Sequence, residues 1–360
     1  MNLFFELLQM AVGRREGLSR FPSDRDEWEA LLDSAVKHNL LGVTFPAIDE
    51  LHDTGKVPLS VYSRWALAAE KTAEKNASLL EECRKLSALF ASAGFRSCVL
   101  KGQGVASLYP DPSLRQSGDI DIWVEGSREA VLSYLRTVCP VGKVVYHHCD
   151  ARLVEGTEVE VHFTPSWMNS PSRNKRLQRY FASVAGEQFS NISEELGFAV
   201  PTLRFNAVYL LIHIYRHVLE EGIGLRQLLD YYYLLTHLDA ASREDAAADL
   251  RKLGLEGFAA AVCFVLQEVF AAPSSILPFS PDSRKGGFLL EEILVSGNFG
   301  RYDGRNAHSS GEGPLAHTFR KVKRGLRFFA MAPSEVLCMP VYMLWQYCWR
   351  KKKNYLYKGR

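Results

Sequence analysis

The stretch Asp119-Ile120-Asp121-Ile122-Trp123-Val124 decides how this 360-residue chain is interpreted. Residues alternate between the two faces of a β-strand, so both aspartates project from one face while the isoleucines enter the other. Two carboxylates held this close repel each other, and burial raises the cost further. A divalent cation relieves that repulsion, and oxygen ligands suit Mg²⁺ or Mn²⁺. The alternative interpretation is a solvated edge strand whose two aspartates bind nothing.

A second acidic strand is predicted at Thr157-Glu158-Val159-Glu160-Val161-His162-Phe163. Its polar and apolar residues alternate with period two, as in a half-buried strand. Glu158, Glu160 and His162 therefore share one face. If this strand lies near the first one, carboxylates from both strands converge on a single cation site.

A short apolar strand is predicted upstream, at Ser97-Cys98-Val99-Leu100-Lys101-Gly102, and it ends at the glycine. The residues from Gln103 to Tyr109 can form a short helix. A strand, a glycine and a helix N-terminus together place backbone amides where a phosphate could bind. The proline-rich turn at 109–113 would then carry Arg115 towards the site. The alternative role for Arg115 is a structural ion pair with Asp119 or Asp121.

Three segments together resemble the nucleotidyltransferase superfamily typified by DNA polymerase β: Leu100-Lys101-Gly102, residues 115–121 and Val159-Glu160-Val161-His162. Within that superfamily, the chain is similar to an uncharacterised bacterial family of nucleotidyltransferase-like proteins with helical flanks. The resemblance covers about residues 91–165 well and the helical remainder loosely. One departure concerns the phosphate turn, where the superfamily usually has Gly-Ser or Gly-Gly and this chain has Gly102-Gln103.

The resemblance implies a metal-dependent enzyme that moves a nucleoside monophosphate from an NTP to an acceptor. It implies two Mg²⁺ or Mn²⁺ ions, with Asp119, Asp121 and Glu160 as the catalytic and metal-binding residues. The residues expected to bind substrate are Lys101, Gly102, Gln103, Arg115 and His162. The lysine and arginine would stabilise phosphate charge, and His162 would either orient the acceptor or hydrogen-bond a carboxylate.

The sequence leaves the acceptor open among a small molecule, a protein and an RNA. Two alternatives to this enzyme stay open as well. One is a catalytically retired protein that binds a nucleotide or a partner on the same scaffold. The other is a toxin-like transferase acting on tRNA, for which the basic stretches at 320–324 and 350–353 provide the only hint.

The pattern of apolar residues predicts an α+β fold, in which a small mixed sheet is flanked by helical regions. We expect an N-terminal helical region at 1–93, a nucleotidyltransferase-like core at 94–170 and a C-terminal helical region at 171–360. The predicted strands of the core are 97–101, 119–124, 143–148, 151–155 and 157–164. The predicted helices are 61–93, 128–138, 202–219 and 225–238. Residues 149–150 are expected to connect two strands as a hairpin.

Composition places the chain among cytoplasmic globular proteins. The net charge of +2 gives no global reason to expect nucleic-acid binding. Seven scattered cysteines without a Cys-x-x-Cys motif suit reduced, mostly buried thiols. The first residues have an acid within their apolar run, which argues against a signal peptide. The apolar stretch 336–349 is shorter than the ~20 residues of a membrane-spanning helix, so we expect a buried helix and no stable membrane insertion.

Two further pairs of residues lie one helical turn apart. His213 and His217 resemble a zinc pair, but Ile214 replaces the glutamate of the metalloprotease motif, so packing or a substrate contact is the expected role. Arg226 and Asp230 are expected to form an intrahelical ion pair, with a nucleotide-facing role as the alternative.

Overall fold

The computed structural model describes residues 2–306, 314–353 and 355. Two compact units are present, and each is assembled from separate parts of the chain. Unit 1 is drawn from Met1–Ala77, Leu108–Gln116 and His213–Glu312, and unit 2 from Ser78–Ser107, Ser117–Ile212 and Gly313–Arg360. The predicted division into 1–93, 94–170 and 171–360 is contiguous in sequence and stays a prediction.

Unit 2 contains a five-stranded mixed sheet with the strand order β1-β2-β5-β4-β3. The strands are β1 (Ser97–Val99), β2 (Ile120–Val124), β3 (Val141–Val144), β4 (His148–Val154) and β5 (Thr157–His162). β2 and β5 are parallel, and the other neighbouring strands are antiparallel. A two-stranded sheet pairs β6 (Ile192–Ser193) with β7 (Phe198–Ala199). The predicted α+β fold, a small mixed sheet flanked by helices, is confirmed.

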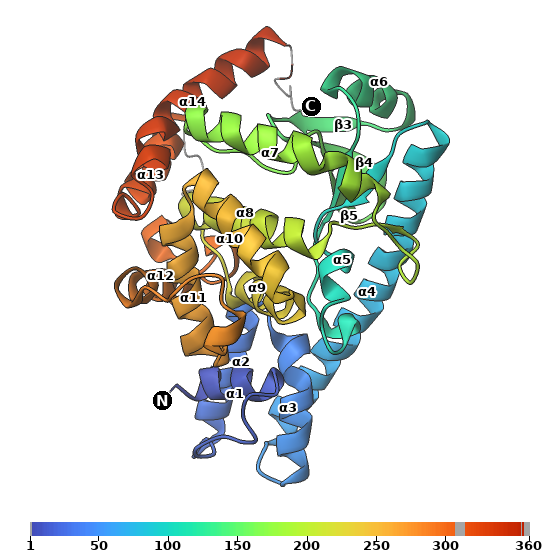
Figure 1. Ribbon diagram of the computed structural model, residues 1–360. Coiled ribbons are helices and arrows are strands. Elements are labelled where there is room, and N and C mark those ends of the chain that lie inside the picture. The colour runs from blue at the N-terminus through green and yellow to red at the C-terminus, as the bar shows by residue number, and fades with distance from the viewer. Residues whose placement is uncertain (1, 307–313, 354, 356–360) are drawn as a thin grey trace. The chain divides into compact units, whose positions relative to one another are not determined.

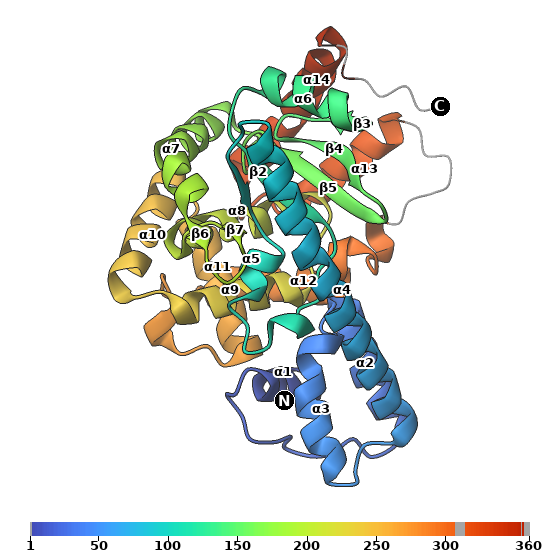
Figure 2. The same cartoon turned by 90° about the vertical axis from the view of Figure 1, so that its right-hand side faces the viewer.

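One face of the larger sheet is apolar and forms the core of unit 2. Helices α4 (Leu59–Ser92) and α6 (Arg128–Val138) cover this face, with α4 running across the strands in Figure 2. Ile122 and Val161 of the central strands are fully buried there, against Phe90 of α4 and Val131 of α6. Because neighbouring residues of a strand point to opposite faces, the polar residues of β2 and β5 are directed to the other face.

The start of α6 shows why the sequence folds this way locally. The Ser127 side chain caps the helix by accepting a hydrogen bond from the Ala130 amide, and Glu129 lies in the first turn. Leu132 and Leu135 recur one turn apart and are buried against the sheet. The predicted bounds 128–138 match the helix.

Helices make up most of the remaining chain (Figure 1). Those of unit 2 are α5 (Gln103–Ala106), α7 (Pro171–Ser190), α13 (Pro314–Arg327) and α14 (Pro333–Lys352). Those of unit 1 are α1 (Leu3–Ala11), α2 (Arg25–His38), α3 (Leu41–Asp53), α9 (Leu225–His237), α10 (Ala240–Leu253), α11 (Glu256–Phe270) and α12 (Ser283–Ser296), with 3₁₀ turns η1 (Pro112–Leu114), η2 (Ser274–Ile276), η3 (Asn298–Gly300) and η4 (Gly304–Asn306). α4 and α8 (Leu203–Glu220) contribute residues to both units.

The predicted hairpin at 149–150 is wrong in its position. The chain turns at 145–147, between β3 and β4, so Cys149 and Asp150 lie inside β4. The next reversal follows at Gly156, whose φ of +75° is readily adopted by glycine. Polar residues are frequent throughout this segment, so its sequence is compatible with a turn at several positions. The pairing of β4 with β5 determines that the chain turns at 145–147 and at Gly156.

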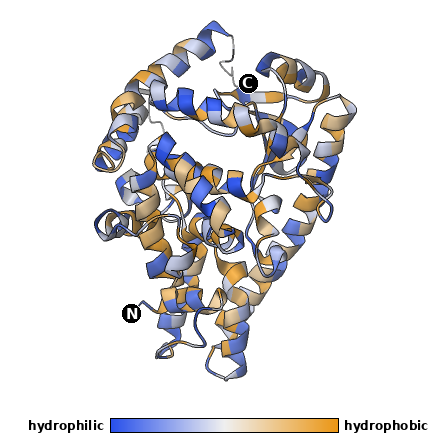
Figure 3. Ribbon diagram, viewed as in Figure 1, coloured by the Kyte–Doolittle hydropathy of each residue, from blue (hydrophilic) through white to orange (hydrophobic). Residues whose placement is uncertain are grey.

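The prediction of a buried C-terminal helix is also wrong. α14 buries only Glu335, Val336 and Met339, whereas Leu337, Val341, Leu344, Trp345 and Tyr347 are exposed. Apolar residues surround this helix on every side, so the sequence could not tell which strip would pack. Hydrophilic residues gather at its C-terminal end (Figure 3). Among the described residues, no helix has the length and apolar character needed to cross a membrane.

The expectation that most of the thiols are buried is confirmed. All seven thiols are free, and Cys83, Cys98, Cys149 and Cys263 are buried. Burial raises the pKa of Cys83 to about 12, so this thiol stays protonated and unreactive at neutral pH.

A buried ion pair holds part of unit 1 together. Arg115 donates to both carboxylate oxygens of Asp230, with Nε 2.7 Å from Oδ1 and Nη2 2.8 Å from Oδ2. Asp230 also accepts from the Tyr109 hydroxyl at 2.6 Å and pairs with Arg226 at 3.3 Å. The expected contact between Arg226 and Asp230 is therefore present, as one part of a larger network. Burial raises the pKa of Asp230, but Arg115 and Arg226 lower it more, so the carboxyl lies below its ordinary value.

Replacing Asp230 with asparagine should destabilise the protein by about 3–5 kcal/mol, because the buried Arg115 guanidinium loses the carboxylate charge that it pairs with. Chemical denaturation at neutral pH measures this change. Since the folded pKa of Asp230 is depressed, its contribution is present above the ordinary aspartate value and disappears as the pH falls through the folded value.

Lys252→Gln provides a matched control for the Asp230 variant. It removes the mostly exposed partner of a 2.9 Å ion pair with Asp249 in the same unit. The expected loss is about 0–1 kcal/mol. Equal losses in the two variants would contradict a structural role for the buried pair.

Candidate functional site

The strand register gathers polar residues on the second face of the larger sheet. Asp121 of β2 lies opposite Glu160 of β5. On the other side of β5, Glu160 lies opposite Asp150 and His162 lies opposite His148. Directly paired residues share a sheet face, so all five side chains are on the face away from α4 and α6. The convergence of acidic strands that the sequence predicted is therefore built into the pairing of β2, β5 and β4.

Three carboxylates form a group that could hold a metal ion. Asp119, Asp121 and Glu160 each offer an oxygen, and these oxygens all lie within 4.8 Å of one another. Asp121 is buried, whereas Asp119 and Glu160 are partly exposed. The group thus combines a fixed inner ligand with two ligands that solvent can reach, and its oxygen donors fit a hard divalent cation.

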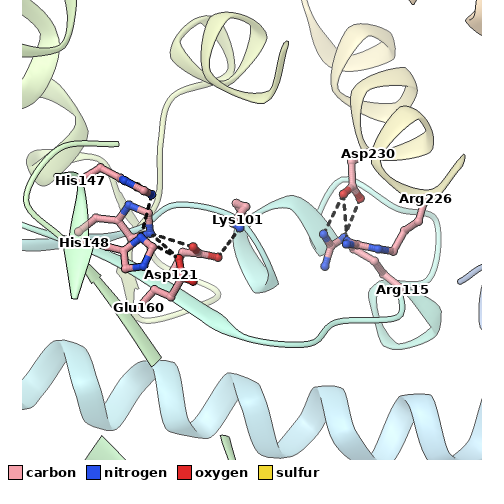
Figure 4. A network of polar contacts seen from close by, with 9 residues as sticks. Lys101, Arg115, Asp121, His147, His148, Glu160, Arg226 and Asp230 are labelled. Carbon is pink, nitrogen blue, oxygen red and sulfur yellow. Dashed lines mark hydrogen bonds and ion pairs between the residues drawn. The ribbon is translucent and has the colours of Figure 1, made fainter. Parts of the chain in front are cut away.

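Lys101 forms a tight ion pair with the innermost carboxylate of this group. Its Nζ lies 2.7 Å from Oδ2 of Asp121 (Figure 4), and the lysine side chain is largely buried. Burial alone would lower the pKa of Lys101, but Asp121 and Asp119 raise it above its ordinary value. Burial raises the pKa of Asp121, and Lys101 followed by His162 lowers it below its ordinary value. Both partners are therefore charged at neutral pH.

His162 bridges the other oxygen of Asp121 to Glu160. Its Nε2 lies 2.9 Å from Oδ1 of Asp121 and 3.4 Å from Oε2 of Glu160. Burial lowers the pKa of His162, but hydrogen bonds to the two carboxylates raise it to about 9. Burial raises the pKa of Glu160, and His162 and His148 lower it to about 2. Asp121 and Glu160 are thus ionised and available as ligands. Lys101 and His162 hold Asp121 in place, and His162 also contacts Glu160.

The structure adds two histidines that the sequence prediction missed. His148 begins β4, and its Nδ1 lies 3.3 Å from Oε2 of Glu160. The same Nδ1 lies 2.8 Å from Nε2 of His147, whose ring stacks on Trp167 at 3.8 Å between ring centroids. The sequence signal for them was the pair His147-His148 followed by Asp150. The predicted hairpin at 149–150 placed these residues at a turn, so their position beside β5 was missed.

The predicted phosphate turn has the expected local structure. β1 ends at Val99, Gly102 has φ +57° and ψ −115°, and α5 begins at Gln103. The turn is packed closely against the rest of unit 2, because a Cβ at Gly104 would lie 2.9 Å from the Val200 side chain. The roles of Gly102 and Gln103 in substrate binding stay predictions.

Two residues that the sequence analysis considered for the site, Arg115 and Glu158, are not members of the three-carboxylate group. Arg115 belongs to unit 1, and the ion pair described for it is with Asp230, whereas its alternative role in the sequence analysis was an ion pair with Asp119 or Asp121. Glu158 occupies the same strand face as Glu160 but is exposed.

The sheet, the carboxylate group and the strand–glycine–helix turn agree with the nucleotidyltransferase class expected from the sequence. A family model described as an uncharacterised nucleotidyltransferase matches residues 24–271, which is more than half of the chain. The chain therefore belongs to this family, and the match supports nucleotidyl transfer in general terms. Comparison with curated proteins gives no match.

Lys101 and a divalent cation should compete for Asp121. Replacing Lys101 with methionine keeps the length of the side chain and removes the competing charge, so Mn²⁺ should bind the nucleotide-free protein about tenfold more tightly or better. Calorimetric titration measures the affinity. Lys85→Met removes a mostly exposed lysine of unit 2 and should leave the affinity unchanged. An unchanged affinity in Lys101→Met would show that the cation does not use Asp121.

Proposed function

We propose that this protein transfers a nucleoside monophosphate from an NTP to a hydroxyl or phosphate acceptor. The observation that carries the proposal is the convergence of three carboxylates, from two adjoining strands, beside the Lys101–Gly102 turn. Membership of a nucleotidyltransferase family supports the reaction class. The donor is an NTP, and the acceptor is a small molecule, a protein or an RNA.

The donor set fits two Mg²⁺ or Mn²⁺ ions. Asp119, Asp121 and Glu160 would hold them, and oxygen ligands in this number are typical of such ions. When bound, the ions make the acceptor hydroxyl easier to deprotonate and neutralise charge on the leaving pyrophosphate. The partial exposure of Asp119 and Glu160 supports access from solvent.

The side chains around the carboxylates orient the reactants and stabilise charge. Lys101, released from Asp121, would bind phosphate oxygens, where its ammonium stabilises the negative charge of the transition state. The backbone amides that follow Gly102 would contact the terminal phosphates, with Gln103 in place of the usual serine. His162 would keep Asp121 and Glu160 in position through its Nε2 contacts. Arg115 would also bind phosphate oxygens. To do so, it would have to share its guanidinium between the phosphate and its ion-pair partner Asp230.

Replacing Asp119 and Asp121 together with asparagine should lower nucleotidyl transfer by at least about 100-fold, since the ions lose two ligands. The assay incubates the protein with labelled NTPs, Mg²⁺ or Mn²⁺ and a cell extract, and measures the label joined to an acceptor. Glu158→Gln is the matched control, because it neutralises an exposed carboxylate on the same strand as Glu160. Transfer that persists in the double variant would reject the assigned site.

A second candidate function is a retired transferase that binds a nucleotide or a partner without turnover. The specific observation in its favour is the Lys101 ammonium, which lies where a cation would otherwise neutralise Asp121. Calorimetry of Mg-ATP distinguishes the two candidates. Binding without transfer to any acceptor in the extract would favour the retired form, and label transfer that depends on Asp119 and Asp121 would exclude it.

A further inference from the structure

A second group of metal-binding side chains adjoins the carboxylate group. His148, Glu160 and His162 each offer one ligand atom, and these atoms lie within 4.8 Å of one another. The three residues come from the neighbouring strands β4 and β5, and His148 is paired directly with His162 in the register. Their positions are therefore fixed by backbone hydrogen bonds of the sheet, which gives rigid placement to the donors.

The two distances from Glu160 to the histidines match the edges of a tetrahedral metal site. Oε2 of Glu160 lies 3.3 Å from Nδ1 of His148 and 3.4 Å from Nε2 of His162. Both separations exceed the ~2.9 Å of a usual N–H···O hydrogen bond. Metal bonds of about 2.0–2.1 Å at tetrahedral angles place neighbouring ligand atoms about 3.3–3.4 Å apart. A single oxygen thus faces two nitrogens at the spacing expected when all three share one ion.

His148 directs Nδ1 towards Glu160, and the same nitrogen lies 2.8 Å from Nε2 of His147, a contact that a bound ion would displace. The other nitrogen of His148, Nε2, lies 3.4 Å from Oδ1 of Asp150, which is the carboxylate–histidine arrangement that orients metal ligands. The buried Nδ1 of His162 has no hydrogen-bond partner in the described part of the chain, whereas its Nε2 lies 2.9 Å from Oδ1 of Asp121. A zinc ion bound at Nε2, the nitrogen that faces Glu160, would therefore take the place of the proton that this nitrogen shares with Asp121.

We propose that His148, Glu160 and His162 bind one Zn²⁺ ion, separately from the cations of the three-carboxylate group. Imidazole nitrogens suit zinc and other borderline cations, whereas Mg²⁺ prefers oxygen ligands. Two histidines and one glutamate are a known zinc ligand set that leaves a fourth position for water or another oxygen ligand. Glu160 belongs to both groups and would connect the two sites. The proposal does not depend on the proposed nucleotidyl transfer.

Zinc binding is measured on the full chain without nucleotide, after metal removal by a chelator, by competition with a chromophoric zinc chelator. The wild type should bind one Zn²⁺ with micromolar affinity or better, and millimolar Mg²⁺ should not displace it. His148→Ala should weaken binding at least about tenfold, since a direct ligand is lost. His148 lies at the start of a strand, so thermal melting of the metal-free variant checks its folding.

Three control variants separate this site from other zinc ligands. Asp119→Asn removes a ligand found only in the three-carboxylate group. His213→Ala breaks the other histidine pair, whose rings lie 4.3 Å apart, and Cys348→Ser removes the exposed thiol. All three should keep the wild-type affinity for zinc. In addition, Co²⁺ should give the visible spectrum of tetrahedral coordination in the wild type and lose it in His148→Ala.

Two results would overturn the proposal. One is zinc binding weaker than millimolar in the wild type. The other is an equal loss in Asp119→Asn and His148→Ala, which would place the ion among the carboxylates. Because no nucleotide is present, a failure of nucleotidyl transfer leaves this measurement unchanged, so the two proposals fail separately.

Discussion

The parallel pairing of β2 with β5 is the constraint on which the site depends. It sets Asp121 beside Glu160, two like charges whose proximity is unfavourable by itself. The pairing is held from the other face of the sheet, where Ile122 and Val161 are fully buried against α4 and α6. A slip of one residue would turn those isoleucine and valine side chains to the polar face. Burial of the apolar face therefore enforces the contact between the carboxylates.

Much of this arrangement could be predicted from the sequence, because it follows from alternation along single strands. The face shared by Asp119 and Asp121, the face shared by Glu160 and His162, and the bounds of α6 all follow from local periodicity and capping. Membership of the nucleotidyltransferase family was predictable from the same short segments. These features need no knowledge of which strands are neighbours.

The features that the sequence did not predict depend on contacts between distant segments. His148 reaches the site only because β4 pairs with β5, and the position of the preceding turn was ambiguous in the sequence. Arg115 pairs with Asp230, which is 115 residues away in the sequence. Local patterns suggest instead an ion pair with an aspartate close to Arg115 in the sequence. α14 has apolar residues on all sides, so the packing of other segments against it determines which of its residues stay exposed. In each case long-range packing selects one of several arrangements that local patterns allow.

The charges of the side chains around the site offset the repulsion among its three carboxylates. Lys101 holds one oxygen of Asp121 and His162 the other, while Glu160 contacts His162 and His148. The pKa values of Asp121 and Glu160 are thereby lowered and both carboxylates are ionised, although Asp121 is buried. A cation that enters must replace a side-chain cation that is already in place. Metal binding is then an exchange of charges, and the ammonium that it displaces is released beside the turn where a phosphate would lie. Under the proposed function, the Lys101 ammonium held by this contact would supply positive charge to the phosphates of the donor.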